Sequence, residues 1–191
     1  MAWTNDQVSE KETAKILELA RKCLNVEGDF VEMGCYKGDT SLLLAEILKD
    51  SEKRLWIYDS FEGLPEKSKF DESVLGGNFK VGELGVTKRE VKLRFLKAGL
   101  PVPVIKKAWF KDLTPDDLPE KIAFAFLDGD FYESIRDSLR LVVPKMVKGG
   151  AIIVHDYNNP ALPGVAKAVD EWLKEQDVKT EIYQSLMIVG L

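Results

Sequence analysis

Two apolar runs that end abruptly in polar side chains constrain the fold of this chain more than any other feature. Residues 124–127 are wholly apolar and run directly into two carboxylates around a glycine, and residues 151–154 run into a histidine and an aspartate. Unbroken apolar runs of this kind are typical of strands buried on both faces of an α/β sheet, and ligands bind at the carboxyl edge of such sheets. The side chains expected together at that edge are Asp128, Asp130, His155 and Asp156.

The composition is that of one ordinary globular domain, residues 1–191. Of the 191 residues, 45% are hydrophobic and 31% are charged, so the chain can bury a full core. The net charge is −5, and no segment combines clustered Lys and Arg with aromatic residues, which argues against a nucleic-acid partner. No apolar run approaches the roughly 18 residues of a membrane span and the start resembles no export signal, so we expect a cytoplasmic protein without a membrane partner. The 2 cysteines form no C-x-x-C pair, which suits a reducing compartment.

Apolar runs alternate with amphipathic stretches along the chain, which predicts an α/β fold with a mostly parallel seven-stranded sheet and helices on both faces. The last two predicted strands leave no room for a helix between them, so a hairpin must make the last strand antiparallel. An N-terminal helical segment, 1–27, precedes the sheet. The predicted strands are 29–35, 55–58, 104–109, 122–128, 150–155, 180–184 and 186–190, and the predicted helices are 6–23, 39–49, 87–98, 132–142 and 163–175.

The segment 62–86 interrupts this alternation. It contains five of the 14 glycines, at positions 63, 76, 77, 82 and 85, and glycine-rich length is costly to order. A connection this long inside a compact domain is either functional or a solvated linker. We interpret it as an insertion that forms a lid over the substrate, with the linker as the alternative.

The loop after the first predicted strand has the spacing of a cofactor site. An acid is followed by two glycines four residues apart just before a helix, which differs from the G-x-G-x-x-G of dinucleotide sites. Glycines permit close backbone approach, and the acid can engage an ammonium group, so the loop suits the amino-acid end of S-adenosylmethionine. A purely structural loop is the alternative. The candidate cofactor contacts here are Glu32, Gly34, Cys35, Tyr36, Gly38 and Thr40.

The second predicted strand ends in an acid at the position of a ribose ligand. Asp59 lies 21 residues beyond Gly38, where nucleoside-binding α/β folds place the acid that accepts hydrogen bonds from ribose hydroxyls. Phe61, just beyond it, and Trp109, at the end of the third predicted strand, are candidates to pack on adenine, or else they only cover the sheet edge. Taken with the first loop, these residues make S-adenosylmethionine the leading cofactor.

Four longer motifs then resemble a known family. Residues 58–65, 108–112, 126–134 and 149–157 are similar to the macrocin O-methyltransferases, whose best-known members methylate sugar or phenolic hydroxyls of antibiotics. The resemblance covers roughly residues 28–173 and implies a Rossmann-like class I methyltransferase fold. It also implies cofactor contacts around Glu32, Gly34, Asp59, Ser60 and Phe61, and a divalent metal, usually magnesium, bound by Asp128 and the acidic pair after the fifth strand.

The chain departs from this family pattern in two places. The family usually has Asp-Asp-Tyr after the fifth strand, but this chain has His155, Asp156 and Tyr157, so the metal ligands become Asp128, His155 and Asp156. Magnesium seldom prefers an imidazole, which leaves another divalent ion open. The segment before the first strand is also shorter than in typical members, which indicates a smaller acceptor or a more open pocket.

The chemistry of methyl transfer explains why such residues would be needed. A hydroxyl keeps its proton at neutral pH, and a bound divalent cation can lower the pKa of a coordinated hydroxyl. Asp128 or Asp130 could then accept the proton, although Asp130 could instead cap helix 132–142. His155 is a metal ligand, a general base or a structural residue. Tyr132 and Tyr157 either line the acceptor pocket or pack at the sheet edge.

The sequence therefore predicts an S-adenosylmethionine-dependent O-methyltransferase with a divalent metal, acting on a hydroxyl of a small molecule. The catalytic residues would be Asp128, Asp130 and His155. One alternative is a noncatalytic module that binds a nucleoside. Another is a nicotinamide-dependent oxidoreductase, which the absence of G-x-G-x-x-G disfavours. A homo-oligomer is left open.

Overall fold

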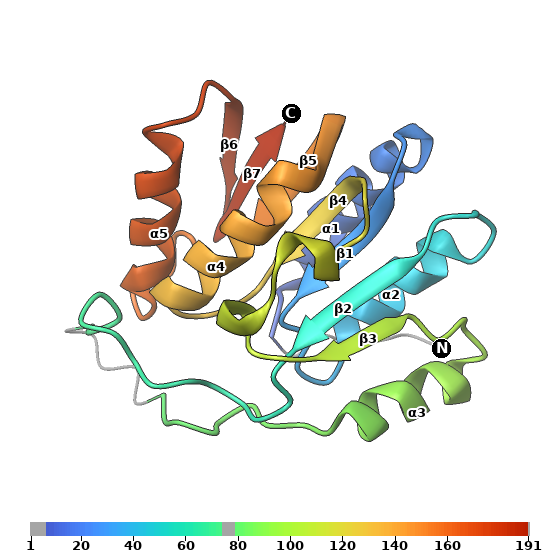
Figure 1. Ribbon diagram of the computed structural model, residues 1–191, viewed down its shortest axis with the longest axis horizontal. Helices are drawn as coiled ribbons and strands as arrows, with labels where there is room; N and C mark the ends of the chain where they lie inside the picture. The colour runs from blue at the N-terminus through green and yellow to red at the C-terminus, as the bar shows by residue number, and fades with distance from the viewer. Residues whose placement is uncertain (1–6, 74–78, 191) are drawn as a thin grey trace.

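The structure is a computed structural model that describes residues 7–73 and 79–190. Seven strands form one sheet with helices on both sides (Figure 1). The strands are β1 (Asp29–Met33), β2 (Leu55–Asp59), β3 (Val104–Lys107), β4 (Ile122–Leu127), β5 (Met146–Val154), β6 (Lys179–Tyr183) and β7 (Leu186–Gly190), and the α-helices are α1 (Glu10–Lys22), α2 (Asp39–Leu48), α3 (Lys88–Ala98), α4 (Tyr132–Val142) and α5 (Pro163–Leu173).

The sheet has the topology that the sequence predicts. Its strand order is β3-β2-β1-β4-β5-β7-β6, with parallel pairing from β3 to β5. Only β7 runs antiparallel to both of its neighbours, because it forms a hairpin with β6 and lies between β5 and β6. The strand order reverses direction between β1 and β4, and open α/β sheets bind their ligands beside such a switch point.

The alternating direction of successive side chains along the central strands explains why helices cover both faces of the sheet. In β4, Phe124 and Phe126 pack with α1, α2 and α3, whereas Ala125 and Leu127 pack with α4 and α5. Successive side chains of a strand point to opposite faces, so a strand that is apolar throughout serves two layers. All six residues of β4 are buried, which confirms that this run is a central strand.

Several element boundaries differ from the predicted ones. β1 ends at Met33 because Gly34 has a φ of 90° and turns the chain out of the sheet. α1 begins at Glu10, where Ser9 and Glu12 form a capping box, and the predicted start at residue 6 lies outside the described residues. β5 begins at Met146, earlier than predicted, because Met146 pairs with Ile122. None of the described helices is long and apolar enough to cross a membrane.

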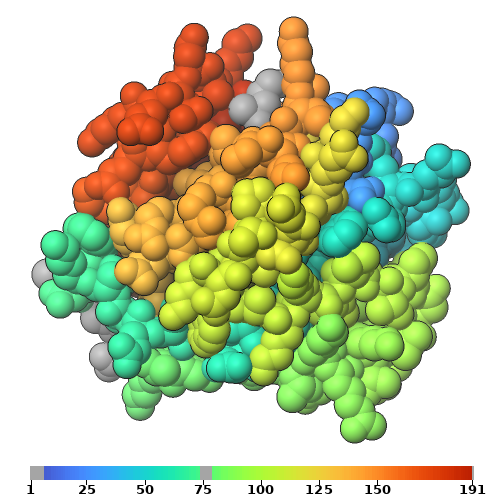
Figure 2. Space-filling view, in the orientation of Figure 1, coloured from blue at the N-terminus to red at the C-terminus, as the bar shows by residue number. Residues whose placement is uncertain are grey.

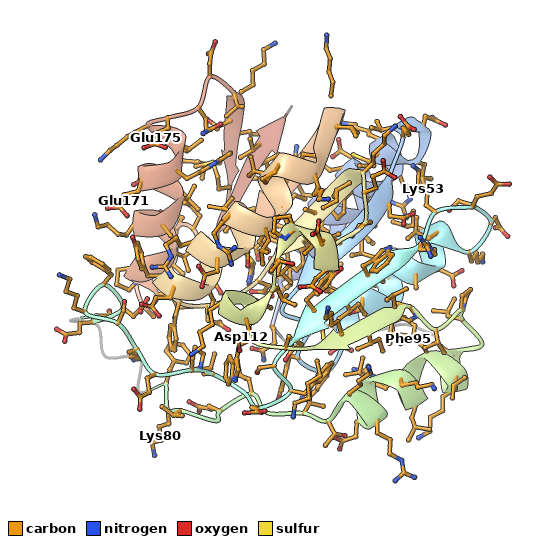
Figure 3. The ribbon with its side chains drawn as sticks, viewed as in Figure 1. Lys53, Lys80, Phe95, Asp112, Glu171 and Glu175 are labelled. Atoms are coloured by element: carbon orange, nitrogen blue, oxygen red, sulfur yellow. The ribbon has the colours of Figure 1, made fainter. Side chains whose placement is uncertain are left out.

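The described parts of the insertion, 62–73 and 79–86, contain neither helix nor strand. Two backbone hydrogen bonds join its ends, from Leu64 N to the Glu83 carbonyl at 2.8 Å and from Gly82 N to the Leu64 carbonyl at 2.9 Å. From this base the chain extends toward the starts of α4 and α5, at the lower left of the molecule in Figures 1 and 2. Lys80 on the returning half points into solvent (Figure 3). Residues 74–78 of the predicted lid lie outside the described part of the chain.

Candidate active site

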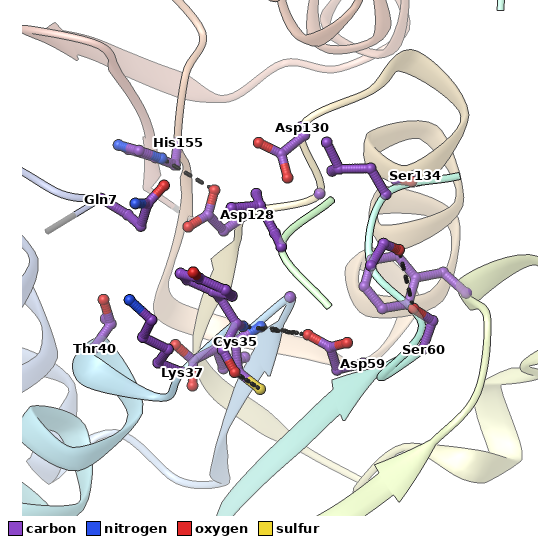
Figure 4. A pocket seen from close by; sticks show the side chains of 18 of the residues that line it. Gln7, Cys35, Lys37, Thr40, Asp59, Ser60, Asp128, Asp130, Ser134 and His155 are labelled. Carbon is purple, nitrogen blue, oxygen red and sulfur yellow. Dashed lines mark hydrogen bonds and ion pairs between the residues drawn. The ribbon is translucent and has the colours of Figure 1, made fainter. Parts of the chain in front are cut away.

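A pocket opens at the carboxyl edge of the sheet, beside the switch point between β1 and β4 (Figure 4). Its walls come from the ends of β1, β2, β4 and β5 and from the loops that follow them. Gly38 and Phe61 are not among the described residues that line it. The predicted site residues that do line it are Glu32, Gly34, Cys35, Tyr36, Thr40, Asp59, Ser60, Trp109, Asp128, Asp130, His155 and Asp156.

The loop after β1 is held tightly against the neighbouring strands. A Cβ added to Gly34 would lie 2.0 Å from the carbonyl oxygen of Asp128, so only glycine fits between β1 and β4. The Asp59 Oδ2 atom accepts hydrogen bonds from Cys35 N at 2.9 Å and Tyr36 N at 3.4 Å. Gly38 begins α2 as its N-cap in the left-handed conformation, a structural position beneath the pocket. The carboxylate of Asp59 thus fixes the shape of the loop from the end of β2.

Glu32 places a carboxyl group in the pocket wall with very little contact with solvent. Its side chain is 1% exposed, and its Oε2 accepts a hydrogen bond from the Ser41 hydroxyl. Burial raises the pKa of Glu32 to about 8, and the negative charges of Asp128, Asp59 and Asp39 add to that shift, while the Ser41 hydrogen bond opposes it. Such a site favours the binding of a cationic group beside Glu32, because a nearby positive charge would stabilise the ionised form of its carboxyl group.

The other end of the pocket is an acidic cluster around the single histidine. The His155 Nδ1 atom lies 3.0 Å from Asp128 Oδ1 and 3.2 Å from Asp156 Oδ2, and the residue is 5% exposed. Burial alone would lower the pKa of His155, but the charges and hydrogen bonds of Asp128 and Asp156 outweigh it and raise the pKa to about 11. Each of the three side chains offers a ligand atom within 4.8 Å of the others, a spacing that one metal ion could bridge.

Asp130 faces this cluster and does not cap α4. The N-cap of α4 is Phe131, which makes no side-chain capping bond, and the Tyr132 N–H donates instead to Asp71 Oδ1 at 2.7 Å. The capping alternative for Asp130 is therefore wrong. Asp130 has a φ of 61°, and burial, followed by the charges of Asp128 and Asp156, raises the pKa of its carboxyl well above the usual value.

Three aromatic residues serve packing rather than the pocket lining. Phe61 is 8% exposed and belongs to the hydrophobic cluster under α1, α2 and α3, so the packing alternative holds for it. The Tyr157 hydroxyl donates to Asp170 of α5 at 2.8 Å, and the Tyr132 hydroxyl donates to Glu171 at 2.7 Å. Both tyrosines thus hold α5 and are not among the residues that line the pocket.

Sequence reasoning missed several residues that line the pocket. Gln7 and Val8 reach it from the segment before α1, and Ser134 reaches it from the first turn of α4. No local pattern marks the first two, whereas Ser134 lies within the 126–134 motif and could have been included. The base of the insertion contributes Gly63, Leu64, Pro65 and Leu84. The other lining residues that were missed lie beside predicted ones or predicted elements, and they are Lys37, Asp39, Ala108, Phe110 and Gly129.

Known proteins with similar sequences are methyltransferases of natural-product pathways. The chain is 34% identical over 141 residues to the 8-demethyl-8-(2,3-dimethoxy-alpha-L-rhamnosyl)-tetracenomycin-C 4'-O-methyltransferase of Streptomyces olivaceus, a match that covers 69% of this chain and 54% of the relative. It is 33% identical over 185 residues to the demethyldecarbamoylnovobiocin O-methyltransferase of Streptomyces niveus, covering 88% of this chain and 69% of the relative. The chain thus spans about half to two thirds of the length of these relatives.

Solved structures agree with the sequence matches. The O-methyltransferase NovP superimposes with a TM-score of 0.84 at 28% identity, over 94% of this chain and 79% of NovP. The calicheamicin methyltransferase CalS11 shares the fold, with a TM-score of 0.77 at 19% identity over 96% of this chain and 80% of CalS11. The model of the macrocin-O-methyltransferase (TylF) family matches residues 12–187. The chain therefore belongs to the macrocin O-methyltransferase family, as its motifs predict.

Proposed function

We propose that this protein transfers a methyl group from S-adenosylmethionine to a hydroxyl of a small molecule, with the help of a divalent cation. One observation carries the proposal. A single pocket at the switch point of the sheet joins a glycine loop with a buried acid, suited to the donor, to a cluster of acids around Asp128, suited to the acceptor. The family membership of the chain supports the same reaction.

The donor end is formed by the loop after β1 and the end of β2. The Glu32 carboxylate is placed to bind the α-ammonium group of the cofactor. The backbone N–H groups of Cys35, Tyr36 and Phe61 already donate to Asp59. Because a carboxylate has about four acceptor sites, roughly one is left for a ribose hydroxyl. Trp109 and the insertion residues Leu64 and Leu84 would form an apolar wall for adenine. A donor held in this orientation presents its methyl group toward the acidic cluster, and orientation supplies much of the catalysis in displacement reactions.

The donor atoms of Asp128, His155 and Asp156 fit one divalent ion by number and spacing. When bound there, the ion would lower the pKa of the acceptor hydroxyl and hold it in place. Two carboxylates with one imidazole form a mixed set that suits manganese, iron or zinc as well as magnesium. The metal and its identity are part of the proposal.

Asp130 is the residue best placed to accept the proton of the acceptor hydroxyl. It lines the pocket together with Asp128. Burial and the charges of Asp128 and Asp156 raise the pKa of Asp130 well above its usual value, which increases its affinity for a proton. Once protonated, Asp130 would also repel Asp128 and Asp156 less.

The acceptor is proposed to be a sugar or phenolic hydroxyl of a natural product. The name of the Streptomyces olivaceus relative specifies a 4' position. A further relative, the mycinamicin III 3''-O-methyltransferase of Micromonospora griseorubida, is 29% identical over 169 residues. CalS11 is a TDP-rhamnose 3'-O-methyltransferase. We also propose that the insertion 62–86 acts as a lid, because its base lines the pocket. A cytoplasmic location and the lack of a nucleic-acid partner stay predictions from the sequence.

Transfer of a labelled methyl group tests the function. We would incubate the protein with methyl-labelled S-adenosylmethionine, a divalent metal and a panel that contains mycinamicin III, demethyldecarbamoylnovobiocin and TDP-rhamnose. We expect label in at least one product, and we expect Asp130→Asn to retain cofactor binding but lose about 100-fold or more of the rate. Cofactor binding without any transfer would favour the noncatalytic binding module, and binding of NAD in place of S-adenosylmethionine would favour the oxidoreductase.

A further inference from the structure

Asp71, in the outgoing half of the insertion, is a buried carboxylate that the proposed reaction does not use. It is 1% exposed, although the segment around it has no regular secondary structure. Its Oδ2 accepts hydrogen bonds from the N–H and the hydroxyl of Ser68, at 2.8 and 2.6 Å, and its Oδ1 accepts from the Tyr132 N–H at 2.7 Å. A carboxylate buried with three donors has a defined place in the fold, unlike one on a solvated linker.

The bond to Tyr132 makes Asp71 the cap of α4, although 61 residues separate the two in sequence. Helix N-termini require an acceptor for their first N–H groups, and the residue just before the helix usually supplies it. Here Phe131 occupies that position and offers no side-chain acceptor. A negative charge at this place is also favourable toward the helix dipole.

The Asp71 carboxylate and the Tyr132 N–H pack closely against the backbone of Gly164. A Cβ added to Gly164, at the start of α5, would lie 1.8 Å from Asp71 Oδ1 and 2.9 Å from Tyr132 N. The aromatic rings of Phe70 and Tyr132 also pack together at this junction, with their ring centroids 4.5 Å apart. The insertion, the start of α4 and the start of α5 therefore meet at the Asp71 carboxylate.

The cap determines what the neighbouring residue is free to do. Asp130 directly precedes Phe131, and aspartate is among the residues that most favour an N-cap position. Were Asp71 absent, α4 could extend by one residue and Asp130 could cap it, which would turn the Asp130 carboxylate away from Asp128 and Asp156. We propose that Asp71 is a positioning residue that caps α4 from the insertion and so keeps the Asp130 carboxylate directed into the pocket.

The consequence for catalysis rests on the proposed function. The base of the insertion lines the proposed cofactor end of the pocket, and Asp71 holds the helix that follows Asp130 at the proposed acceptor end. One segment thus connects the two ends. Docking of the insertion would then be required for the acidic cluster to be complete.

Three variants test whether Asp71 acts as the cap of α4 or only anchors the insertion to the rest of the fold. Asp71→Ala removes the cap, Asp71→Asn retains an oxygen acceptor for the Tyr132 N–H, and Ser73→Ala removes another anchor of the insertion, the 2.8 Å bond from the Ser73 hydroxyl to the Pro160 carbonyl. A crystal structure of Asp71→Ala requires no acceptor molecule. We expect its Asp130 carboxylate to bond to the first N–H groups of α4, and an Asp130 that still faces Asp128 would overturn the proposal.

Kinetics test the same role once wild-type protein transfers methyl groups. We expect Asp71→Ala to lower kcat about 10- to 100-fold with little change in the Kd of S-adenosylhomocysteine. We expect a smaller loss for Asp71→Asn, whose amide keeps an acceptor for the Tyr132 N–H but turns its NH2 toward the Ser68 donors. Ser73→Ala should remain near wild type. In an Asp130→Asn background, Asp71→Ala should have little further effect, because coupled residues are not additive. Equal losses in Asp71→Ala and Ser73→Ala, or fully additive losses with Asp130→Asn, would contradict the inference. Absence of methyl transfer by the wild-type protein would instead contradict the proposed function. The crystal structure of Asp71→Ala would then be the test of the role of Asp71.

Discussion

At the scale of single residues, Glu32 and His155 represent two ways of burying an ionisable group. Glu32 is buried among other acids, so its pKa rises to about 8 and its carboxyl tends toward the neutral form at pH 7. His155 is also buried, but two carboxylates contact the same ring nitrogen and favour its charged form. The remaining carboxylates of the pocket include Asp59, Asp128 and Asp156, and the cationic donor proposed for it would complement their charge.

The raised pKa of Glu32 predicts how cofactor affinity depends on pH. Because an ammonium group favours ionised Glu32, binding should release a proton below pH 8, and affinity should rise as pH increases from about 6 to 7.5, where the α-amino group of the cofactor is still protonated. Calorimetry in buffers of different ionisation enthalpy measures the released proton. Glu32→Gln should abolish that release and weaken binding about tenfold or more. An unchanged proton release in Glu32→Gln would show that another group is responsible.

His155 predicts the metal preference. Chelation should abolish methyl transfer and leave the affinity for S-adenosylhomocysteine nearly unchanged, since the proposed ligands Asp128 and Asp156 lie at the acceptor end of the pocket. Manganese, iron or zinc should restore activity as well as magnesium does, and His155→Asp should shift the preference toward magnesium by adding a hard oxygen ligand. If His155 is the general base, His155→Asp should alter the pH-rate profile instead. Full activity in metal-free protein would contradict the ligand roles.

At the scale of elements, the close contact between β1 and β4 shapes the pocket. Gly34 combines a φ of 90° with no room for a Cβ, whereas Gly99 has a φ of 70° and no atom within 4 Å of an added Cβ. Gly99→Ala should lower the free energy of unfolding only by the cost of a left-handed backbone, roughly 1–2 kcal/mol. Gly34→Ala should cost clearly more in the free energy of unfolding and should also weaken cofactor binding, as urea denaturation and calorimetry would measure. Equal losses in the free energy of unfolding for the two variants would mean that β1 and β4 can move apart to admit a Cβ at no energetic cost.

The insertion carries a second prediction at this scale. If it acts as a lid, amides in 67–73 and 79–84 should exchange faster in the free protein than in the complex with S-adenosylhomocysteine and acceptor. Hydrogen exchange measured by mass spectrometry reports the change, and the amides of β4 serve as the internal control because that strand is buried throughout. Strong protection of both stretches in the free protein would identify a fixed structural insertion.

At the scale of the whole molecule, the sheet and most of the pocket could be predicted because they depend on local patterns. The apolar runs define β4 and β5, parallel pairing aligns their carboxyl ends, and Asp128 and Asp156 must then lie close together. Gln7 and Asp71 could not be predicted, because each reaches its place through contacts between segments far apart in sequence. The position of Phe61 after Asp59 left adenine packing and sheet-edge packing both open, and its backbone turn at a φ of 54° places it in the hydrophobic cluster under α1, α2 and α3.

A crystal structure with S-adenosylhomocysteine and manganese tests the central claim most directly. The account predicts the amino-acid end of the ligand beside Glu32 and Gly34, a ribose hydroxyl on Asp59, and an anomalous peak for the ion between Asp128 and Asp156. The sulfur should face the acidic cluster across the open part of the pocket. Ligand bound elsewhere on the protein, or an ion that contacts neither Asp128 nor Asp156, would contradict the account.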